Sequence, residues 1–418
     1  MKRLLLAAGG GGDAITAAMV HAALHGAGEP ALVLTYAWER LVVDPVPGPR
    51  RPSDFTGTVP AGPTLRLVTP ATAPRPPAGS LLPGLAAALR PELGLLDPYG
   101  GARGLARQIE EAAAYCRADR VDIVDVGGDV VADGTEPTLR SPLGDALALA
   151  AAAHTALPAF VYVAGPGLDC EVPASVLLPR LGTPLRTLTA ADTLPVARVF
   201  DWHPSEASAL LVAAARGIRG VCGIRDAPHP VTLTATSPAV YRLTLAHALE
   251  LNPLARELAG TRDLAEAERA SQRVCGFSEI ARERERARVV GSPSSLSPPT
   301  APGAIADPTA PPAAPGIVSH RGAPSAAPGP VTGPAAPPAT SAPAGHPATA
   351  SHAAPLPPVS VRFASWERRT ARAGISYVTS RRIVEELGLD HAAWAELRSH
   401  LRAASPSREA APLWRLAG

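Results

Sequence analysis

The chain of 418 residues contains almost no lysine or asparagine. Lys2 is its only lysine, the other 38 of its 39 basic side chains are arginines, and Asn252 is its only asparagine. The scarcity of lysine excludes P-loop nucleotide-binding proteins, protein kinases and Schiff-base enzymes, because each needs a lysine inside its site and Lys2 precedes the first predicted strand. The arginine content indicates a GC-rich genome and says little about function by itself.

Three further absences limit the class of protein. The four cysteines lie far apart without a CxxC pair, which argues against zinc and favours a reduced, cytoplasmic protein. No run approaches the roughly 18 apolar residues that span a bilayer. The net charge is only +2, so nothing indicates bulk attraction to nucleic acid or to an anionic membrane. The oligomeric state stays open.

Residues 291–360 have the composition of a disordered linker. This stretch holds 19 of the 48 prolines and only two acidic or basic residues, Asp307 and Arg321. It has few large apolar side chains to offset the entropy of ordering it. We therefore predict an α/β ligand-binding domain over residues 1–290, a disordered Pro/Ala-rich linker over 291–360 and a short helical segment over 361–418.

Short apolar runs alternate with amphipathic segments in the first domain. The runs predict strands at Leu4–Ala8, Ala31–Tyr36, Thr64–Val68, Val121–Val126, Phe160–Ala164 and Val231–Thr234. The amphipathic segments predict helices at Ala14–His25, Gly104–Arg117, Pro142–His154 and Pro204–Arg216, with 242–290 largely helical. This alternation is typical of a doubly wound, mostly parallel sheet with helices on both faces, a Rossmann-like α/β fold.

The C-terminal segment has helix signals and several large apolar residues. Thr379 or Ser380 can cap a helix that Gly388 closes, and Asp390 can cap the next helix. Two short helices bury little by themselves, so we expect the segment to dock on the main domain. Binding of the segment to another chain is the alternative.

The chain opens with MKRLLLAAGGGGDAITAAM. The apolar stretch Leu4–Ala8 is shorter than the roughly 7–15 residues of a signal peptide core, so a strand that leads into a glycine loop is the better interpretation. Gly10, Gly11 and Gly12 would present backbone N–H groups to a phosphate or carboxylate at a helix N-terminus. Asp13 is either the N-cap of that helix or a group that holds a metal or a ribose hydroxyl. The loop lacks GxGxxG spacing, so dinucleotide binding has little support.

A second strand end carries several carboxylates, in VDIVDVGGDVVADGTEPTLRSPLGD (121–145). Ligands of open α/β sheets bind beyond the carboxyl ends of the strands, where we place Asp125, Gly127, Gly128 and Asp129. We expect Asp13, Asp125 and Asp129 to hold Mg²⁺, with Asp125 and Asp129 as catalytic residues. Glu136 and Ser141 are further candidate ligand-binding residues. The same residue types are common in turns, and Ser141 before Pro142 is more typical of a helix cap than of a nucleophile.

A third strand end has the same form. The run Phe160–Ala164 is followed by GPGLDCE, in which Gly165, Gly167, Asp169 and Glu171 are expected at the ligand. Cys170 fits an inert thiol better than a nucleophile, because no partner histidine is assured. Another helix start, DWHPSEAS, contains Glu206, also a candidate ligand-binding residue, and His203. Helix capping and a position at the rim of the site both remain open for this stretch.

Taken together, these loops resemble the domain of unknown function 1152 family of archaeal and actinobacterial proteins. The resemblance rests on AAGGGGDA (7–14), WER…DPVPGPR (38–50), DVGGD…GTEPTLRSPLGDA (125–146), GPGLDCE (165–171) and SEAS…AARGIRG (205–220). It covers about residues 1–290. Cys170 stands where the resemblance leads us to expect glycine, which counts further against a nucleophile. The resemblance implies a fold and the position of a site but no reaction.

Three functions compete. The first is an enzyme, a metal-assisted hydrolase or transferase, that acts on a nucleotide, nucleoside or sugar phosphate, with Arg40 or Arg140 neutralising charge. The second is a non-catalytic sensor or scaffold with the same pocket, whose C-terminal segment engages a partner. The third is nucleic-acid binding through RERERAR (282–288) and WERRTAR (366–372), which has less support because ion pairs along a helix explain the first run.

Overall fold

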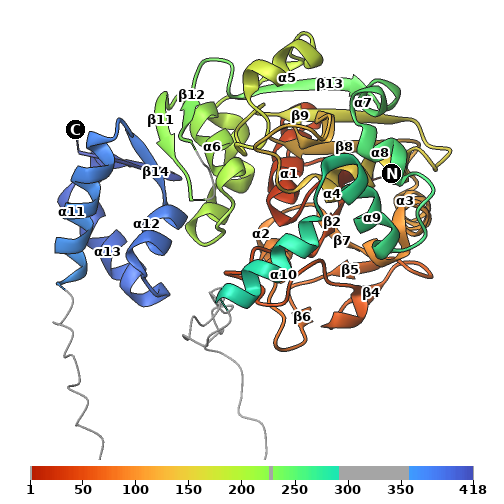
Figure 1. Cartoon of the computed structure of the whole chain (residues 1–418), viewed down its shortest axis with the longest axis horizontal. Coiled ribbons are helices and arrows are strands. Elements are labelled where there is room, and N and C mark those ends of the chain that lie inside the picture. The colour runs from red at the N-terminus through yellow and green to blue at the C-terminus, as the bar shows by residue number, and fades with distance from the viewer. Residues whose placement is uncertain (1, 226–228, 291–356, 418) are drawn as a thin grey trace, which may run out of the picture. The chain divides into compact units, whose positions relative to one another are not determined.

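The computed structural model describes residues 2–225, 229–290 and 357–417, and its main feature is a nine-stranded sheet with the strand order β10-β13-β9-β8-β1-β2-β7-β5-β4 (Figure 1). Five adjacent strands are parallel: β9 (Ala159–Ala164), β8 (Val121–Val126), β1 (Arg3–Ala7), β2 (Ala31–Tyr36) and β7 (Glu92–Leu96). The outer strands run antiparallel to their neighbours: β10 (Arg186–Thr187), β13 (Ala239–Thr244), β5 (Arg66–Val68) and β4 (Val59–Pro60). The predicted α/β class with a mostly parallel sheet is confirmed.

The path of the chain reverses at the centre of the sheet. From β1 the chain continues to β2 and β7 on one side, and it then crosses back to add β8 and β9 on the other side of β1. Leu4 of β1 pairs with Leu32 of β2 in one direction and with Val121 of β8 in the other. The carboxyl ends of β1 and β8 are therefore neighbours, with the connections leaving them on opposite sides.

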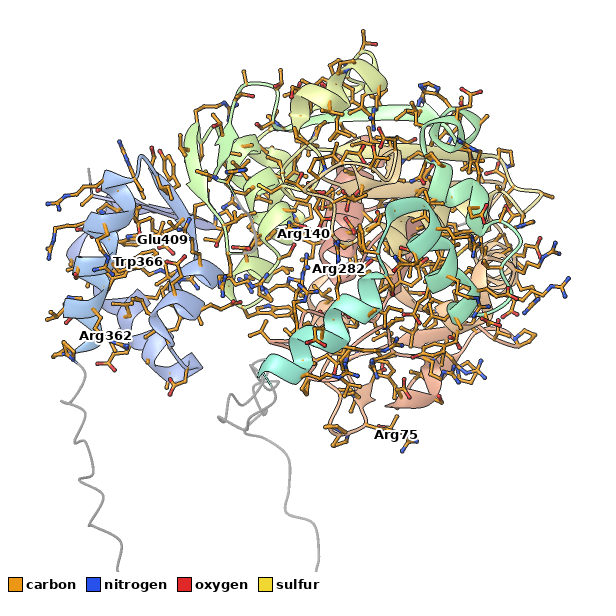
Figure 2. All side chains as sticks on the ribbon, in the orientation of Figure 1. Arg75, Arg140, Arg282, Arg362, Trp366 and Glu409 are labelled. Carbon is orange, nitrogen blue, oxygen red and sulfur yellow. The ribbon has the colours of Figure 1, made fainter. Side chains whose placement is uncertain are left out.

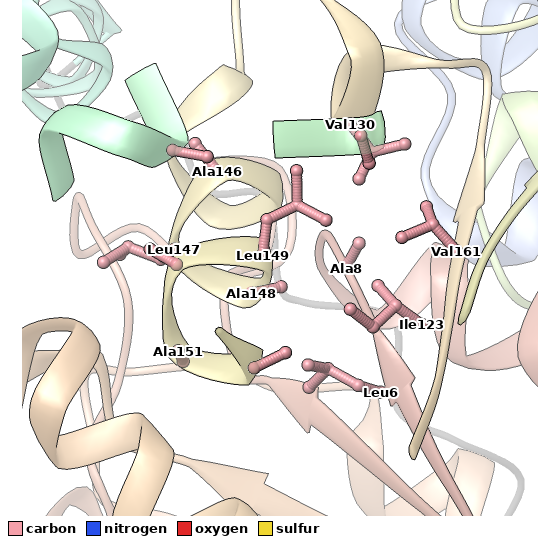
Figure 3. Packing of buried hydrophobic residues seen from close by; sticks show 14 of the residues in the cluster. Leu6, Ala8, Ile123, Val130, Ala146, Leu147, Ala148, Leu149, Ala151 and Val161 are labelled. Carbon is pink, nitrogen blue, oxygen red and sulfur yellow. The ribbon is translucent and has the colours of Figure 1, made fainter. Parts of the chain in front are cut away.

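Helices cover both faces of the sheet. Because strand side chains alternate, Leu4 and Leu6 of β1 pack on one face with α3 (Gly101–Cys116), α4 (Pro142–Ala152), α8 (Pro253–Leu258) and α9 (Leu264–Cys275). Leu5 and Ala7 pack on the other face with α1 (Gly11–His25), α2 (Leu82–Ala88), α6 (Glu206–Ala215) and the 3-10 helix η4 (Ala191–Asp201). Figure 3 shows α4 lying over Leu6, Ala8 and Ile123.

The C-terminal segment contains strands as well as helices. Its helices are α11 (Val359–Arg372), α12 (Ser380–Leu387) and α13 (His391–Ala404), and its strands are β14 (Tyr377–Thr379), β15 (Glu409–Ala410) and β16 (Leu413–Arg415). β14 pairs in parallel with β11 (Gly220–Gly223), which makes a five-stranded sheet of order β12-β11-β14-β16-β15. Thr379 caps α12, Gly388 closes it and Asp390 caps α13, as predicted. The segment is helical as predicted, but it also contains three strands that the sequence analysis did not predict.

The remaining elements complete the fold. They are β3 (Phe55–Thr56), β6 (Ala73–Pro74), β12 (Val231–Leu233), α5 (Ala174–Leu181), α7 (Leu245–Leu251) and α10 (Glu279–Val290), with short 3-10 helices at Pro52–Asp54, Pro98–Gly100, Asp129–Val131 and Pro406–Arg408. The predicted strand at Val231–Thr234 belongs to the second sheet. The expected helical start at residue 242 was wrong because β13 extends to Thr244.

Two further sequence predictions concern the linker and the absence of a membrane-spanning segment. The predicted linker, 291–360, falls almost entirely outside the described residues. Among the helices that the structure does describe, none combines the length and the apolar character needed to cross a membrane.

Candidate functional site

The glycine loop, residues 9–12, connects β1 to α1. The helix begins at Gly11, three residues earlier than predicted, and Gly10 occupies its N-cap position. The N–H of Asp13 bonds to the carbonyl of Gly10, whereas the N–H groups of Gly11 and Gly12 meet no acceptor within the described ranges. A helix N-terminus with unpaired N–H groups is a favourable position for an anion.

Asp13 links the ends of β1 and β8. Its Oδ1 accepts a hydrogen bond of 3.0 Å from the N–H of Val126, the last residue of β8. The N-cap interpretation was wrong, because Asp13 lies inside the first turn of α1. Burial raises the pKa of Asp13 to about 7, opposed by the hydrogen bonds from Val126 and Gly9.

The end of β8 turns sharply on two glycines. Gly127 and Gly128 have φ values of 120° and 123°, a region that favours glycine. A Cβ on Gly127 would lie 2.0 Å from Oδ2 of Asp169, so this glycine also lets the loop after β9 approach. Asp125, 2% exposed, accepts a long hydrogen bond of 3.4 Å from the N–H of Val130.

Three carboxylates from three segments form what we call the carboxylate cluster: Asp13 of α1, Asp125 of β8 and Asp145 of α4. One carboxylate oxygen of each lies within 4.8 Å of the others. Burial, then the charges of Asp125 and Asp13, raises the pKa of Asp145 well above its usual range. Burial and then the charge of Asp13 raise the pKa of Asp125 well above its usual range. Oδ1 of Asp145 has no hydrogen-bond partner among the described residues.

Asp129 lies beside this cluster and contacts Asp169. The sequence interpretation placed Asp129 in the metal set, whereas the structure groups Asp145 with Asp13 and Asp125. The charge of Asp169 is among the causes that raise the pKa of Asp129. Burial and then Glu171 raise the pKa of Asp129 well above its usual range and that of Asp169 to about 8.

Glu171 holds the chain that leads into α4. It accepts hydrogen bonds from the backbone N–H groups of Arg140 (2.6 Å) and Ser141 (2.8 Å), and from Oγ of Ser141 (2.5 Å). Ser141 is the N-cap residue, but its side chain makes no cap hydrogen bond, so that part of the prediction was wrong. Arg140, labelled in Figure 2, donates to the carbonyl of Asp169. These bonds position Asp145 and Asp169 relative to each other.

Other predicted site residues have structural partners. Glu136 accepts bonds from the N–H groups of Asp133 and Gly134 and pairs with Arg180 at 2.9 Å. Gly165 and Gly167 have φ values of 60° and 79°, so glycine suits the turn that carries Asp169. These residues shape the loops around the cluster.

Glu206 faces the C-terminal segment. Its carboxylate accepts hydrogen bonds from the N–H of Arg225 (2.9 Å) and from the hydroxyl of Thr379, and it lies 3.7 Å from Arg381. The predicted ligand-binding residue is thus part of the contact between α6 and the start of α12.

Cys170 and the arginine run of α10 have ordinary surroundings. Cys170 has a φ of 61°, a conformation that favours glycine, and burial raises the pKa of its thiol to about 12, so it carries almost no thiolate at neutral pH. Along α10, Arg286 and Arg288 pair with glutamates of the same helix, whereas Arg284 pairs with Glu268 of α9.

Sequence reasoning missed Glu279. It noted Asp145 and His203 near the predicted site but did not place either of them in the ligand-binding or metal-binding set. Glu279 of α10 accepts a bond of 3.3 Å from the N–H of Leu143, and its charge raises the pKa of Asp145. His203 faces Gly11, with its Nε2 3.7 Å from the position of a Cβ there. SPLGD gave a signal for Asp145, since it predicts a carboxylate in the first turn of a helix that follows the strand end. Nothing in the sequence indicated that α10 reaches α4.

The comparisons with known proteins agree with the resemblance in the loops. The model of the family described as "Protein of unknown function (DUF1152)" matches residues 4–287, which include β1, β8, the glycine loop and the carboxylate cluster. No curated protein and no solved structure matches the chain. Because the family model covers more than half of the chain, the protein belongs to the DUF1152 family.

Proposed function

We propose that this domain binds a nucleotide, nucleoside or sugar phosphate with the help of Mg²⁺, and that it is a metal-assisted hydrolase or transferase. The observation that carries the proposal is the carboxylate cluster: oxygens of Asp13, Asp125 and Asp145 lie within 4.8 Å of one another at the ends of β1 and β8. Mg²⁺ prefers carboxylate oxygen and is commonly bound by a few carboxylates together with substrate phosphates.

Electrostatics support a cation at this position. Asp125 and Asp145 are 2% and 5% exposed, and the charge of Asp125 raises the pKa of Asp145. Buried carboxylates of this kind must retain protons or gain a positive partner. A divalent cation would replace those protons, so binding should release protons to the solvent.

The topology supports a phosphorylated ligand. Along the sheet, β7-β2-β1-β8-β9 corresponds to the order 3-2-1-4-5 in the sequence of parallel strands, which is the order of dinucleotide-binding sheets. In such sheets the ligand lies where the strand order reverses, here between β1 and β8. The glycine loop follows the carboxyl end of β1, so its unpaired N–H groups lie at the same end of the sheet.

Asp125 and Asp129 are the proposed catalytic residues. Asp125 would bind the metal, and Asp129, whose pKa burial and Glu171 raise well above its usual range, would transfer a proton to or from the reacting group. Carboxyls whose surroundings hold their pKa values apart are suited to acid and base roles. Arg140, which donates to the carbonyl of Asp169, would balance negative charge.

Calorimetric titration with Mg²⁺ tests the proposal. Wild type should bind Mg²⁺ and release protons, and Asp145→Asn should weaken binding at least tenfold. Asp122→Asn is the matched control, because Asp122 is a buried carboxylate of β8 that pairs with Arg120 at 3.2 Å instead of joining the cluster. A thermal-shift screen of nucleotides and sugar phosphates with Mg²⁺ then identifies the ligand, since saturation at 100 times Kd adds about 2.7 kcal/mol. Equal Mg²⁺ binding by wild type and Asp145→Asn would overturn the proposal.

A sensor is the second candidate, favoured by the surroundings of α6. Oγ of Ser208 donates to the carbonyl of Gly12 at 2.8 Å, and Glu206 on the same helix bonds to Thr379 of the C-terminal segment. A ligand at the glycine loop would thereby be coupled to that segment. Metal-dependent turnover of the bound ligand supports the enzyme. Ligand binding that changes the protease sensitivity of the C-terminal segment, without turnover, supports the sensor.

A further inference from the structure

His203 is a buried histidine whose protonation is determined by its neighbours. It lies between η4 and α6 and is 8% exposed. Its Nδ1 accepts a hydrogen bond of 3.1 Å from the N–H of Ser205. Because a backbone N–H is always a donor, Nδ1 carries no proton, and the proton of the neutral ring must be on Nε2.

The Nε2–H of His203 has no acceptor among the residues that the structure describes. Burial lowers the pKa of the ring to about 3, so the side chain is a neutral donor at physiological pH. A buried donor without an acceptor costs stability. The position is therefore unusual unless a ligand atom or a water occupies it.

This donor is aimed at Gly11. A Cβ on Gly11 would lie 3.7 Å from Nε2 of His203, 3.6 Å from Leu85 and 3.7 Å from Leu82, all ordinary contact distances. Gly11 is not among the glycines of positive φ. The fold itself would accept alanine here, so the absence of a side chain leaves a space beside an unpaired donor.

The two sides of the glycine loop differ in chemistry. A Cβ on Gly9 would lie 2.2 Å from Oδ2 of Asp13 and 3.7 Å from Oδ2 of Asp145, so Gly9 faces carboxylate oxygens. Gly11 faces an imidazole donor and begins a helix of 15 residues. The first side is suited to a cation and the second to an anion.

We propose that the Nε2–H of His203 and the N–H groups of Gly11 and Gly12 together bind the phosphate group of the ligand. This inference rests on the proposed function, because it assigns one end of the same ligand. Phosphate has enough oxygens to accept from these donors while another oxygen contacts the cation at the carboxylate cluster. His203 is then a ligand-binding residue and a determinant of specificity for phosphorylated molecules.

Inorganic phosphate with Mg²⁺ is the probe. In the full chain, long-range ¹H–¹⁵N spectra of the histidine rings should show His203 protonated at Nε2, and phosphate should shift this resonance. His203→Asn keeps an acceptor for the N–H of Ser205, and its shorter side chain removes the donor at the position of Nε2. It should melt close to the wild-type temperature and bind phosphate about tenfold to a hundredfold more weakly, as expected for loss of a hydrogen bond to a charged group. His203→Gln, which retains a donor, should recover part of the affinity.

The outcomes separate this inference from the proposed function. Wild type that binds Mg²⁺ but leaves the His203 resonance unchanged with phosphate overturns the inference alone. A phosphate-dependent shift without Mg²⁺ binding overturns the metal site alone. Equal phosphate affinity of His203→Asn and wild type also overturns the inference. Acetate is a further arm, and an equal shift with acetate contradicts specificity for phosphate.

Discussion

Alanine substitution of neighbouring glycines should separate the structural from the ligand-binding part of the glycine loop. A Cβ on Gly10 would lie 2.7 Å from the backbone carbonyl oxygen of Trp38, and a backbone atom cannot move away cheaply. Gly10→Ala should therefore lower the free energy of unfolding by about 1–3 kcal/mol, the usual cost of overpacking. A Cβ on Gly11 would have only ordinary contacts, the nearest at 3.6 Å.

Gly11→Ala should consequently stabilise the ligand-free protein. Glycine in a helix costs roughly 0.5–1 kcal/mol relative to alanine, and the new methyl group would be buried against Leu82 and Leu85. The free energy of unfolding should increase by about 0.5–1 kcal/mol. For a domain near this size, each kcal/mol raises Tm by about 2–4 °C. The same methyl group would fill the space in front of Nε2 of His203. The apparent affinity for phosphate in the presence of Mg²⁺, measured from the stabilisation by ligand, should therefore fall at least tenfold.

Urea denaturation at constant pH, with and without phosphate and Mg²⁺, measures both effects. The expected pattern is a higher midpoint for Gly11→Ala without ligand, a lower midpoint for Gly10→Ala, and a ligand-induced increase only where position 11 is glycine. Destabilisation of Gly11→Ala comparable to that of Gly10→Ala would refute the packing argument. A stable Gly11→Ala variant with wild-type phosphate binding would refute the role of the space.

Three further predictions concern charge and the C-terminal segment. Asp145→Asn should melt at a higher temperature than metal-free wild type at pH 8 and should lose the Mg²⁺-dependent increase, as calorimetry can show. Burial raises the pKa of Glu39 to about 7 from an ordinary 4.5, so its stabilising contribution is complete below pH 4.5 and is lost as the pH rises through 7. Glu39→Gln should remove up to about 3 kcal/mol of this pH dependence in urea melts, and an unchanged profile would contradict the assignment. Thr379→Val removes a cap and the bond to Glu206, so limited proteolysis should cut α12 faster, whereas equal rates would contradict that contact.

The central strands could be predicted from the sequence because a strand that is buried on both faces forms a short apolar run in the sequence itself. β1, β2 and β8 are almost continuous apolar runs, as expected for strands covered on both faces. β7 was missed because Gly94 interrupts its run, yet a Cβ there would lie 2.6 Å from Leu34, so this glycine is required by packing between neighbouring strands. β13 was missed because its antiparallel alternation resembles one face of a helix.

The candidate site was predictable only in part, because some of its residues follow strands directly and others reach it through the tertiary fold. Asp13 and Asp125 follow strand ends, and a strand end can be recognised in a sequence. Asp145 enters the cluster because α4 starts beside those ends, and Glu279 reaches it from a helix more than a hundred residues later. His203 meets Gly11 through the packing of α6 on α1. Such proximities depend on the tertiary fold, which propensity and spacing do not encode.

The unpaired groups around the glycine loop have complementary requirements. On one side, Asp145 retains a buried oxygen without a donor, and Asp129 has another. On the other side, His203 and the first amides of α1 retain donors without acceptors. Each group alone costs folding free energy, and a fold selected only for stability would pair or remove them. A cation bound to a phosphate group would satisfy both sets at once, because it brings a positive charge to the carboxylates and anionic oxygens to the donors. A lone cation would leave the donors unpaired, and a lone anion would be repelled by the carboxylates, so the two parts of the proposed ligand should bind cooperatively.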